Sequence, residues 1–304
     1  MVTGGNGLIG TELIRQLLDD DRTTEVLCID NYYTSKKGNN KQFLKRNNYH
    51  IVEWDICTPR NFMAYDQIYH LACPASPVHY QKDQQYTLIT NILGTLNIIR
   101  LAEQMGARML LASTSEVYGD PQVTPQPESY WGNVNTLGPR ACYDEGKRVA
   151  ETICTISEAN TVIARIFNTY GPYMALDDGR AVSNFITQAL QNKPITMHGD
   201  GKQTRSFCYV EDTVRGLIKL MNSDSAGPVN IGNPDEVTLQ KLAQQIIGLC
   251  NSSSWIIHQD AAVDDPRRRC PDISQAQKLL DWNPTVDREQ GLKYTIQYMR
   301  EQLC

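Results

Sequence analysis

The sequence of 304 residues is short of several features, and each absence narrows the range of functions. It has no run of 18 apolar residues, so it offers no stretch long enough to span a membrane as a helix, and it opens with no signal-peptide pattern. Basic residues are outnumbered, which gives a net charge of −5, whereas nucleic-acid-binding proteins are usually basic. We therefore expect neither a membrane nor a nucleic acid as a partner.

Cysteines at metal-binding or disulfide-framework spacing are also lacking. The nine cysteines are scattered and include no C-x-x-C pair, which is typical of free thiols in a reducing compartment. We expect a cytoplasmic protein with no metal. What the chain does have is 41% hydrophobic residues, enough to bury a sizeable core.

The first stretch with chemical meaning is the glycine-rich segment 4–10, which follows a short apolar stub and precedes a helical pattern. Glycines at positions 4, 7 and 10 allow a tight turn, close approach to a pyrophosphate and close packing of helix on strand. The apolar run 26–29 then ends in Asp30, whose carboxylate can bind ribose hydroxyls and would repel a 2′-phosphate. This order predicts NAD rather than NADP. The stub is either an unusually short strand or the remainder of a longer one.

Apolar runs and helical patterns alternate along the rest of the chain. Further strands are expected at 52–56, 67–72, from 110, at 162–168 and at 229–231, with helices at 90–105, 143–158, 182–191 and 239–249. The alternation predicts an α/β fold, a doubly wound parallel (Rossmann) sheet with a smaller C-terminal substrate domain. We assign residues 1–171 and the return segment 208–231 to the NAD-binding domain, and residues 172–207 and 232–304 to the substrate domain.

The stretch 110–147 predicts the chemistry. Tyr143 and Lys147 are four residues apart and so share one face of a helix, and the end of the preceding strand can bring Thr114 to the same place. A tyrosine has a pKa of about 10, which a nearby ammonium and a positive nicotinamide ring would lower. The trio could then take a proton from a carbinol while its hydride leaves. Tyr-x-x-x-Lys alone equally fits a surface helix with a buried ring, and it is the agreement with the glycine-rich segment that favours catalysis.

Two groups of arginines are candidate anion contacts. Arg140 lies one helical turn before Tyr143 and can reach a phosphate or carboxylate, or can simply be an exposed charge. Arg267, Arg268 and Arg269 form either a solvated charge run or a site for a diphosphate, and the acidity of the whole chain favours the diphosphate. The long polar segment 119–143 is expected to be a functional loop.

These motifs together resemble the extended short-chain dehydrogenases/reductases that act on nucleotide sugars, and within them the UDP-glucuronate decarboxylase (UDP-xylose synthase) family. The similarity covers nearly the whole chain. Its most specific segments are 113–121, 138–148, 164–169 and 177–180.

The resemblance implies NAD-dependent decarboxylation of UDP-glucuronate to UDP-xylose through a 4-keto intermediate, with bound NADH returning the hydride, in a homodimer. The pair Ser115-Glu116 favours a decarboxylase over dehydratases with Asp-Glu and over epimerases without the Glu, although GDP-mannose dehydratases share Ser-Glu. Three alternatives stay open: an oxidative decarboxylase that releases the 4-keto pentose and NADH, another nucleotide-sugar dehydratase or epimerase, and, least favoured, a non-catalytic NAD-binding scaffold.

The resemblance also implies a set of site residues. The expected catalytic residues are Thr114, Ser115, Glu116, Tyr143, Lys147 and Arg269. The expected cofactor contacts are Gly4, Gly7, Leu8, Ile9, Asp30, Asn31, Tyr33, Thr34, Asp55, Ile56, Leu71, Ala72, Tyr143 and Lys147. The expected substrate contacts are Ala75, Tyr80, Arg140, Asn168, Arg180 and Arg205. Many relatives carry serine at Cys73 and lysine at Ile89, and the second departure bears on substrate affinity.

Overall fold

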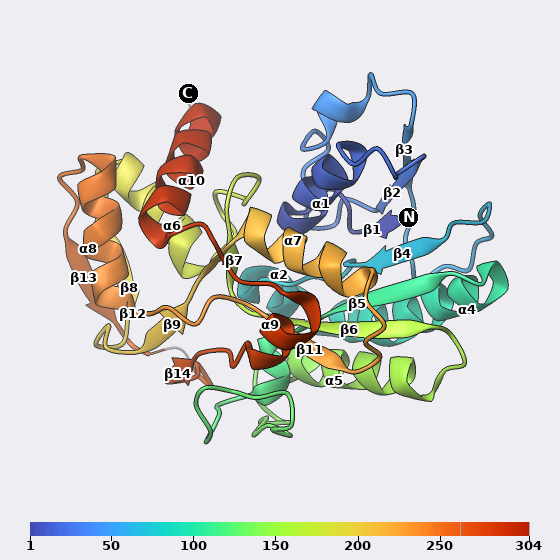
Figure 1. Ribbon diagram of the computed structural model, residues 1–304. Coiled ribbons are helices and arrows are strands. Elements are labelled where there is room, and N and C mark those ends of the chain that lie inside the picture. The colour runs from blue at the N-terminus through green and yellow to red at the C-terminus, as the bar shows by residue number, and fades with distance from the viewer. Residues whose placement is uncertain (262, 304) are drawn as a thin grey trace.

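The computed structural model describes residues 1–261 and 263–303 and has a parallel sheet at its centre (Figure 1). Seven strands pair in the order β11-β6-β5-β4-β1-β2-β3, and every neighbouring pair is parallel. Their bounds are β1 Val2–Thr3, β2 Val26–Asp30, β3 Tyr49–Glu53, β4 Gln67–His70, β5 Arg108–Thr114, β6 Thr161–Ile166 and β11 Pro228–Ile231. The predicted doubly wound sheet is confirmed, with a first strand of only two residues.

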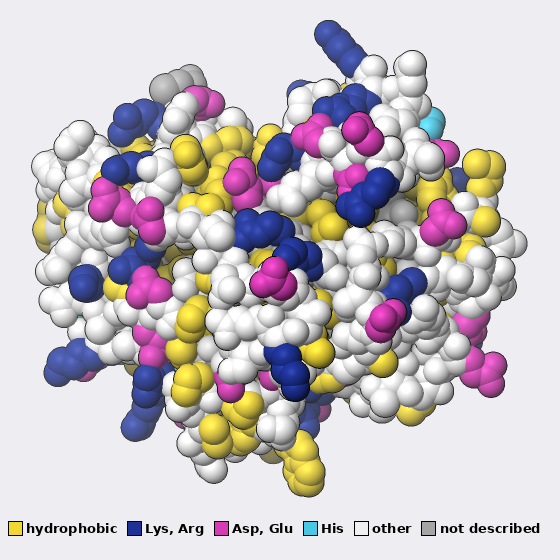
Figure 2. All heavy atoms as spheres, viewed as in Figure 1, with side chains coloured by type: hydrophobic (Ala, Val, Ile, Leu, Met, Phe, Trp, Pro, Cys, Tyr) yellow, Lys and Arg dark blue, Asp and Glu magenta, His cyan; other side chains and the backbone are white. Residues whose placement is uncertain are grey.

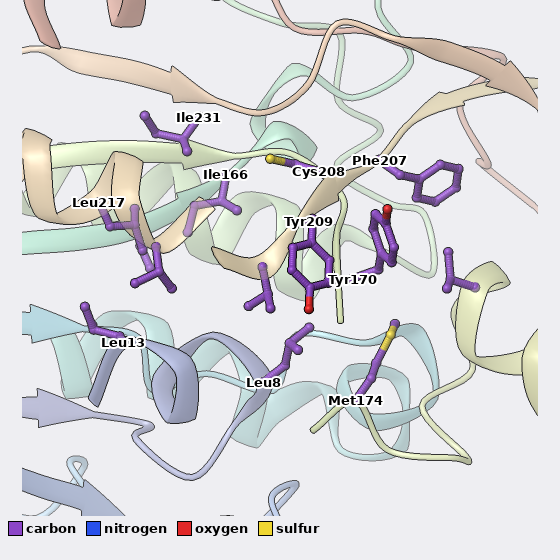
Figure 3. Close-up of a cluster of buried hydrophobic side chains, with 14 of the residues drawn as sticks. Leu8, Leu13, Ile166, Tyr170, Met174, Phe207, Cys208, Tyr209, Leu217 and Ile231 are labelled. Atoms are coloured by element: carbon purple, nitrogen blue, oxygen red, sulfur yellow. The ribbon is translucent and has the colours of Figure 1, made fainter. Parts of the chain in front are cut away.

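Helices cover both faces of the sheet, and each face has its own buried apolar cluster. One face packs against α1 (Leu8–Leu18) and α7 (Val210–Met221), and the other against α4 (Thr95–Met105) and α5 (Ala141–Ile156). Figure 3 shows the first cluster, where Leu13 of α1 and Leu217 of α7 lie near the strand residue Ile166. Two-sided burial explains why the strands read as nearly continuous apolar runs.

The strand order places a crevice at the carboxyl edge of the sheet. From β1 the chain builds outward through β2 and β3, and it then returns to β4 on the other side of β1 and continues through β5 and β6. At such a reversal the loops leave the sheet in opposite directions, which opens a space for a ligand. The loops after β1, β4, β5 and β6 therefore meet at one place.

Three element boundaries differ from the sequence predictions. The third strand ends at Glu53, so Asp55 lies in the turn that follows it rather than in the strand. The helix expected from residue 90 begins earlier, as α3 (Gln84–Ile89), where the Asp83 side chain caps the Tyr86 amide at 2.9 Å. A π-helical turn, η2 (Thr90–Gly94), joins α3 to α4, and this widened turn makes room for the close packing of α5.

The C-terminal third adds small sheets and helices beside the carboxyl edge, on the left of Figure 1. Strand β8 (Ile195–His198) pairs with β13 (Ile256–Gln259), and β9 (Thr204–Ser206) lies between β12 (Glu236–Thr238) and β14 (Arg268–Arg269). The two-residue strands β7 (Thr169–Tyr170) and β10 (Cys208–Tyr209) pair between the two regions. The helices of this third are α6 (Ala181–Leu190), α8 (Leu239–Cys250) and α10 (Arg288–Leu303).

The division into two domains stays a prediction. Helix α9 (Ser274–Leu280) falls in the segment assigned to the substrate domain, yet it packs against α7 and β11 of the large sheet. The remaining short elements are η1 (Lys41–Phe43), α2 (Pro77–Lys82) and η3 (Ser115–Tyr118), and residues 119–140 form the expected long loop without further helix. Within 1–261 and 263–303, no helix has the length and apolar character needed to cross a membrane.

Candidate active site

A cleft follows the carboxyl edge of the sheet and reaches α10. Figure 2 shows the surface hollowed between the lobe that carries α10 and the lobe that carries α1. Most of the predicted site residues line this cleft: Gly4, Gly7, Leu8, Ile9, Asp30, Asn31, Tyr33, Thr34, Ile56, Leu71, Ala72, Ala75, Thr114, Glu116, Tyr143, Lys147, Asn168 and Arg180. The structure does not place Asp55, Tyr80, Ser115, Arg140, Arg205 or Arg269 on the cleft wall.

The glycine-rich segment has the geometry expected of a phosphate-binding loop. A Cβ on Gly10 would lie 2.4 Å from the Gly4 carbonyl oxygen, and Gly4 has φ +70° with the Ala72 amide nitrogen 2.8 Å from its would-be Cβ. Gly7 is different, because its would-be Cβ meets only the Gly4 carbonyl oxygen, at an ordinary contact distance of 3.4 Å. Helix α1 begins there without a side-chain cap. Its first amides are therefore free to bind an anion such as a diphosphate.

Asp30 ends β2 and holds the loop that follows it. Its carboxylate accepts hydrogen bonds from the amides of Asn6 (2.9 Å) and Tyr32 (2.8 Å) and from the Ser35 hydroxyl (2.8 Å). Asp30 is buried and still lines the cleft, so the carboxylate both shapes the loop and faces the ligand space.

Asp55 was expected to contact the cofactor, and the structure gives its carboxylate protein partners instead. Asn31 and the Tyr86 hydroxyl donate to one oxygen at 3.2 and 2.7 Å, and the Cys57 amide donates to the other at 2.9 Å. Burial alone would raise the pKa of Asp55, but these hydrogen bonds lower it. Strand β3 ends at Glu53, three residues before the predicted end at 56, and Asp55, which is not part of the cleft wall, stays a predicted cofactor contact.

Tyr143 and Lys147 lie on the first turns of α5, opposite the end of β5. The Lys147 ammonium donates to the Ala112 carbonyl at 2.9 Å and lies 6.0 Å from the centre of the Tyr143 ring. Tyr80 stacks on that ring, with centroids 5.1 Å apart and an interplanar angle of 7°. Thr114, at the end of β5, accepts from the Glu116 amide at 3.2 Å and lines the same part of the cleft. The predicted trio is brought together.

The expected lowering of the tyrosine pKa does not come from the protein alone. Burial raises the pKa of Tyr143 well above its ordinary value, and the Thr114 hydroxyl opposes that rise only in part. Burial lowers the pKa of the Arg180 guanidinium, but Asp178 and, to a smaller extent, Tyr143 raise it above its ordinary value, so Arg180 lies within electrostatic reach of the phenol. Lys147 and Arg180 are thus the two cations of the cleft wall whose positive charges could stabilise the phenolate form of Tyr143.

A buried ion cluster lies next to Tyr143. Arg269 donates to both oxygens of Glu116 at 2.6 and 2.9 Å, and Arg140 donates to one of them at 2.5 Å. Burial would raise the pKa of Glu116, but Arg269 and Arg140 lower it to about 2, so the carboxylate is ionised at neutral pH. The two guanidiniums and one carboxylate leave a charge of +1. Arg140 therefore pairs with a carboxylate of the chain itself, and its predicted contact with the substrate stays a prediction.

The other arginines divide between the site and the surface. Arg180 pairs with Asp178 at 2.5 Å on the cleft wall, and buried Arg205 pairs with Asp265 at 2.8 Å. Arg268 turns outward and pairs with Glu236 at 2.5 Å, so the run 267–269 is not a single anion site as expected. The side chains of adjacent residues on β14 point to opposite sides, and only Arg269 reaches the cluster.

Several cleft residues were missed from the sequence. Asn6 follows the glycines, Met174 and Tyr173 lie in the loop after β7, and Tyr298 and Gln302 come from α10. The glycine pattern was a signal for Asn6, but no local pattern marks the α10 residues, because their position depends on how the last helix packs. Within 1–261 and 263–303, no group of three His, Cys, Asp or Glu side chains is placed to hold a metal, and the eight described cysteines are unpaired.

Comparison with known proteins identifies relatives over the whole chain. UDP-glucuronic acid decarboxylase 1 of Danio rerio is 50% identical over 307 residues, which cover 100% of this chain and 73% of the relative. UDP-glucuronic acid decarboxylase 6 of Arabidopsis thaliana is 51% identical over 296 residues, which cover 96% and 86% of the two chains.

Solved structures of similar fold include nucleotide-sugar epimerases. UDP-glucuronic acid 4-epimerase from Bacillus cereus, in complex with UDP-glucuronic acid and NAD, has a TM-score of 0.87 at 27% identity, with 100% of this chain and 99% of that chain covered. UDP-glucose 4-epimerase from Thermotoga maritima with UDP-glucose has a TM-score of 0.88 at 25% identity and the same coverage. The profile of the NAD dependent epimerase/dehydratase family matches residues 1–232. The chain therefore belongs to the NAD dependent epimerase/dehydratase family.

Proposed function

We propose that this protein is a UDP-glucuronate decarboxylase that uses bound NAD and forms UDP-xylose through a 4-keto intermediate. The observation that carries the proposal is the Glu116 cluster beside Tyr143. Its net charge of +1 suits one more carboxylate, and the sugar of UDP-glucuronate brings one next to the carbon to be oxidised. The names of the curated relatives, about half identical over the full chain, support the same reaction.

The cleft fits a dinucleotide with a free ribose. The uncapped start of α1 and the open side of Gly7 suit the pyrophosphate, and Asp30 suits the adenine ribose. NAD bound there supplies a hydride acceptor and, once reduced, a hydride donor for C4 of the sugar. We propose that Lys147 contacts the cofactor, and its position on the cleft wall, with the ammonium bound to the Ala112 carbonyl, supports this role.

The oxidation half of the reaction falls to Tyr143 and Thr114. Thr114 holds the C4 oxygen of the sugar, and the Tyr143 phenolate takes its proton as the carbon is oxidised. Because burial raises the pKa of Tyr143, the phenolate needs the positive charges of Lys147 and Arg180 together with that of the oxidised cofactor. General bases of this kind typically contribute about 10²–10⁴-fold to rate.

The decarboxylation half falls to the Glu116 cluster. The 4-keto acid is a β-keto acid, and the bond to the carboxyl carbon breaks with its electrons passing into the C4 carbonyl as an enolate. Arg140 and Arg269 lie behind Glu116, so their charges attract the sugar carboxylate towards this part of the cleft, and ionised Glu116 repels it as CO₂ departs. C5 of the enolate then gains a proton, and Tyr143 returns its proton as the C4 hydroxyl is restored. Ser115 is buried next to Thr114 in the sequence, and we propose that it helps to hold Thr114 and Glu116 in position for this step.

Substrate binding is shared by both lobes. We propose that Ala75, Asn168 and Arg180 contact the sugar nucleotide from the cleft wall. Tyr80 acts by stacking on the Tyr143 ring. Arg205 is buried and pairs with Asp265, and it would bind the diphosphate of the substrate by exchanging Asp265 for a phosphate oxygen.

The enzyme also has a face suited to a homodimer. Leu88, Ile89 and Leu93 lie exposed along α3 and η2, which pack against α5. Such a contiguous apolar stripe on a helix pair is typical of a subunit interface. Light scattering at micromolar concentration should give twice the chain mass, and Ile89→Glu should give the monomer. A monomeric wild type would remove this part of the proposal.

The function is tested by the products formed from UDP-glucuronate with substoichiometric NAD. UDP-xylose and CO₂ in equal amounts, with no net NADH, are expected by mass spectrometry and absorbance. Stoichiometric NADH with a 4-keto pentose would identify the oxidative decarboxylase instead, and UDP-galacturonate would identify a 4-epimerase. Tyr143→Phe should abolish both NADH and CO₂ formation, while Tyr294→Phe, a half-exposed tyrosine outside the cleft, should act as wild type.

A further inference from the structure

Four buried polar atoms around Glu116 have no hydrogen-bond partner within the described residues. They are Tyr80 Oη, Arg140 Nε, Asp144 Oδ1 and Arg269 Nε. Tyr80 lies close enough to Arg140, Glu116, Asp144 and Arg269 for each of them to shift its pKa, so the four atoms belong to one cluster. Buried polar groups are almost always paired, and four in one place mark a site where charge or protons are handled.

Asp144 is the member of this cluster that the mechanism above does not use. It follows Tyr143 on α5, is 6% exposed, and its amide donates to the Arg140 carbonyl in the first helical turn. Its buried Oδ1 has no partner, although an ionised carboxylate in that position would be strongly driven to find one. Burial and the neighbouring Glu116 raise the pKa of Asp144 to about 7, against the pull of Arg140 and Arg269.

Charge decides which form Asp144 takes. Before the substrate binds, ionised Asp144 balances the +1 of Glu116, Arg140 and Arg269. Asp265 lies 3.8 Å from Arg140 but makes its shorter ion pair with Arg205, at 2.8 Å, so the charges of Asp265 and Arg205 cancel each other. A sugar carboxylate entering the same cluster makes the buried site negative unless one carboxylate gains a proton. Glu116 accepts hydrogen bonds from two guanidiniums, which keep it ionised, so Asp144 is the carboxylate that gains the proton.

The titratable and charged groups near Asp144 are those that shift its pKa or whose pKa it shifts. They are Tyr80, Glu116, Arg140 and Arg269 from the elements packed against it, and Cys142, Tyr143 and Glu145 from its own helix. Two are cations, and both pair with Glu116, while Arg140 has a second, longer contact of 3.8 Å with Asp265.

We propose that Asp144 is a positioning residue for charge: it takes up a proton as the substrate carboxylate enters beside Glu116 and releases it as CO₂ departs. This inference rests on the proposed function. The balance closes, because decarboxylation converts R–COO⁻ and H⁺ into R–H and CO₂. The carbon–carbon bond breaks with its electrons passing into the enolate, and C5 takes one proton from solvent. Asp144 returns to solvent the proton that it took up on binding, so one proton is consumed for each CO₂ formed.

Proton uptake can be measured directly with the NAD-loaded Tyr143→Phe protein, which binds without turnover. UDP-glucuronate is titrated calorimetrically at pH 8 in phosphate and in Tris, whose ionisation enthalpies differ. We expect about one proton taken up per site, because a carboxyl with a pKa near 7 is mostly ionised at that pH. UDP-glucose, which has no carboxylate, should bind without uptake.

Variants on α5 identify the group. Asp144→Asn in the Tyr143→Phe background should abolish uptake, whereas Glu145→Gln, the neighbouring half-buried carboxylate, should leave it unchanged. In the active enzyme, kcat/KM of wild type should fall about tenfold per pH unit above the pKa of Asp144, and Asp144→Asn should remove that limb while Glu145→Gln keeps it. A merely structural Asp144 would not move a pH profile.

The outcomes separate the inference from the function on which it rests. If wild type makes UDP-xylose but UDP-glucuronate binds without proton uptake, or if uptake survives Asp144→Asn, the role of Asp144 is overturned and the function stands. If wild type makes no UDP-xylose, the proposed function fails, and the inference fails with it.

Discussion

At the scale of single residues, Glu116 carries the strongest expectation. Glu116→Gln keeps the size of the side chain but leaves Arg140 and Arg269 buried without a counter-charge. Removing one partner of a buried ion pair lowers the free energy of unfolding by about 3–5 kcal/mol, which urea denaturation should show. Glu236→Gln, which breaks the exposed pair with Arg268, is the matched control and should change stability by about 0–1 kcal/mol.

The same variant separates the two halves of the reaction. In a single turnover followed by absorbance of bound NADH and by CO₂ release, Glu116→Gln should still oxidise C4 and should lose more CO₂ formation than NADH formation. An equal loss of both would mean that Glu116 only positions the substrate. Full UDP-xylose synthesis would remove Glu116 from the site.

Asp30 should decide between NAD and NADP. Asp30→Asn removes the charge that would repel a 2′-phosphate, so fluorescence titration should show weaker NAD binding and a narrower preference over NADP. The Asn6 and Tyr32 amides and the Ser35 hydroxyl lose a charged acceptor, so some loop stability is lost as well. Ser35→Ala keeps the carboxylate and should keep the preference; wild type that binds NADP as tightly as NAD would contradict this role.

At the scale of elements, the position of α5 depends on the absence of a Cβ at Gly146. A Cβ on Gly146 would lie 2.9 Å from Asn91 Nδ2 in the π-helical turn η2. Gly146→Ala should therefore push α5 away and move Tyr143 and Lys147 on either side of it, which should lower kcat at least tenfold by our expectation from misplaced catalytic groups. Activity assays and thermal unfolding check this.

The matched control for that change is Gly248→Ala in α8. Its would-be Cβ meets nothing within 4 Å, so the substitution should raise stability by about 0.4–1 kcal/mol through the unfolded chain and leave kcat unchanged. If Gly146→Ala behaved like Gly248→Ala, the close packing of α5 on η2 would not be what places the catalytic pair.

At the scale of the whole molecule, Asp144 gives stability a pH dependence of known sign. Its pKa is raised from 3.8 to about 7 in the folded chain, so its contribution to stability is fully present below the unfolded value and is lost as pH rises through 7. Asp144→Asn should therefore unfold at a higher temperature than wild type at pH 8.5 and at nearly the same temperature at pH 4. If the unfolding temperature of wild type instead rose relative to that of Asp144→Asn with increasing pH, the sign predicted here would be wrong.

The sequence predicted correctly those features whose structure depends on residues close together in the chain. The glycine segment, the acid after β2 and the Tyr143–Lys147 pair each depend on one strand–helix junction, so their positions followed from spacing. The end of β3 was predicted three residues too late, so Asp55 was expected within a strand although it lies beyond it. The resemblance named Glu116 and Arg269 as catalytic residues, but the contact between them was not predicted, since it depends on tertiary packing.

That long-range contact also has a consequence for synthesis. Glu116 and Arg269 are 153 residues apart in the sequence. A chain on the ribosome therefore exposes its glycine-rich segment, Tyr143 and Lys147 well before Arg269 is synthesised. At roughly 5–20 residues per second, N-terminal regions begin to fold first and wait several seconds for the rest. Under the proposed function, a nascent chain interrupted before Arg269 would hold a dinucleotide without directing the loss of CO₂, so catalytic competence arrives only near the end of translation.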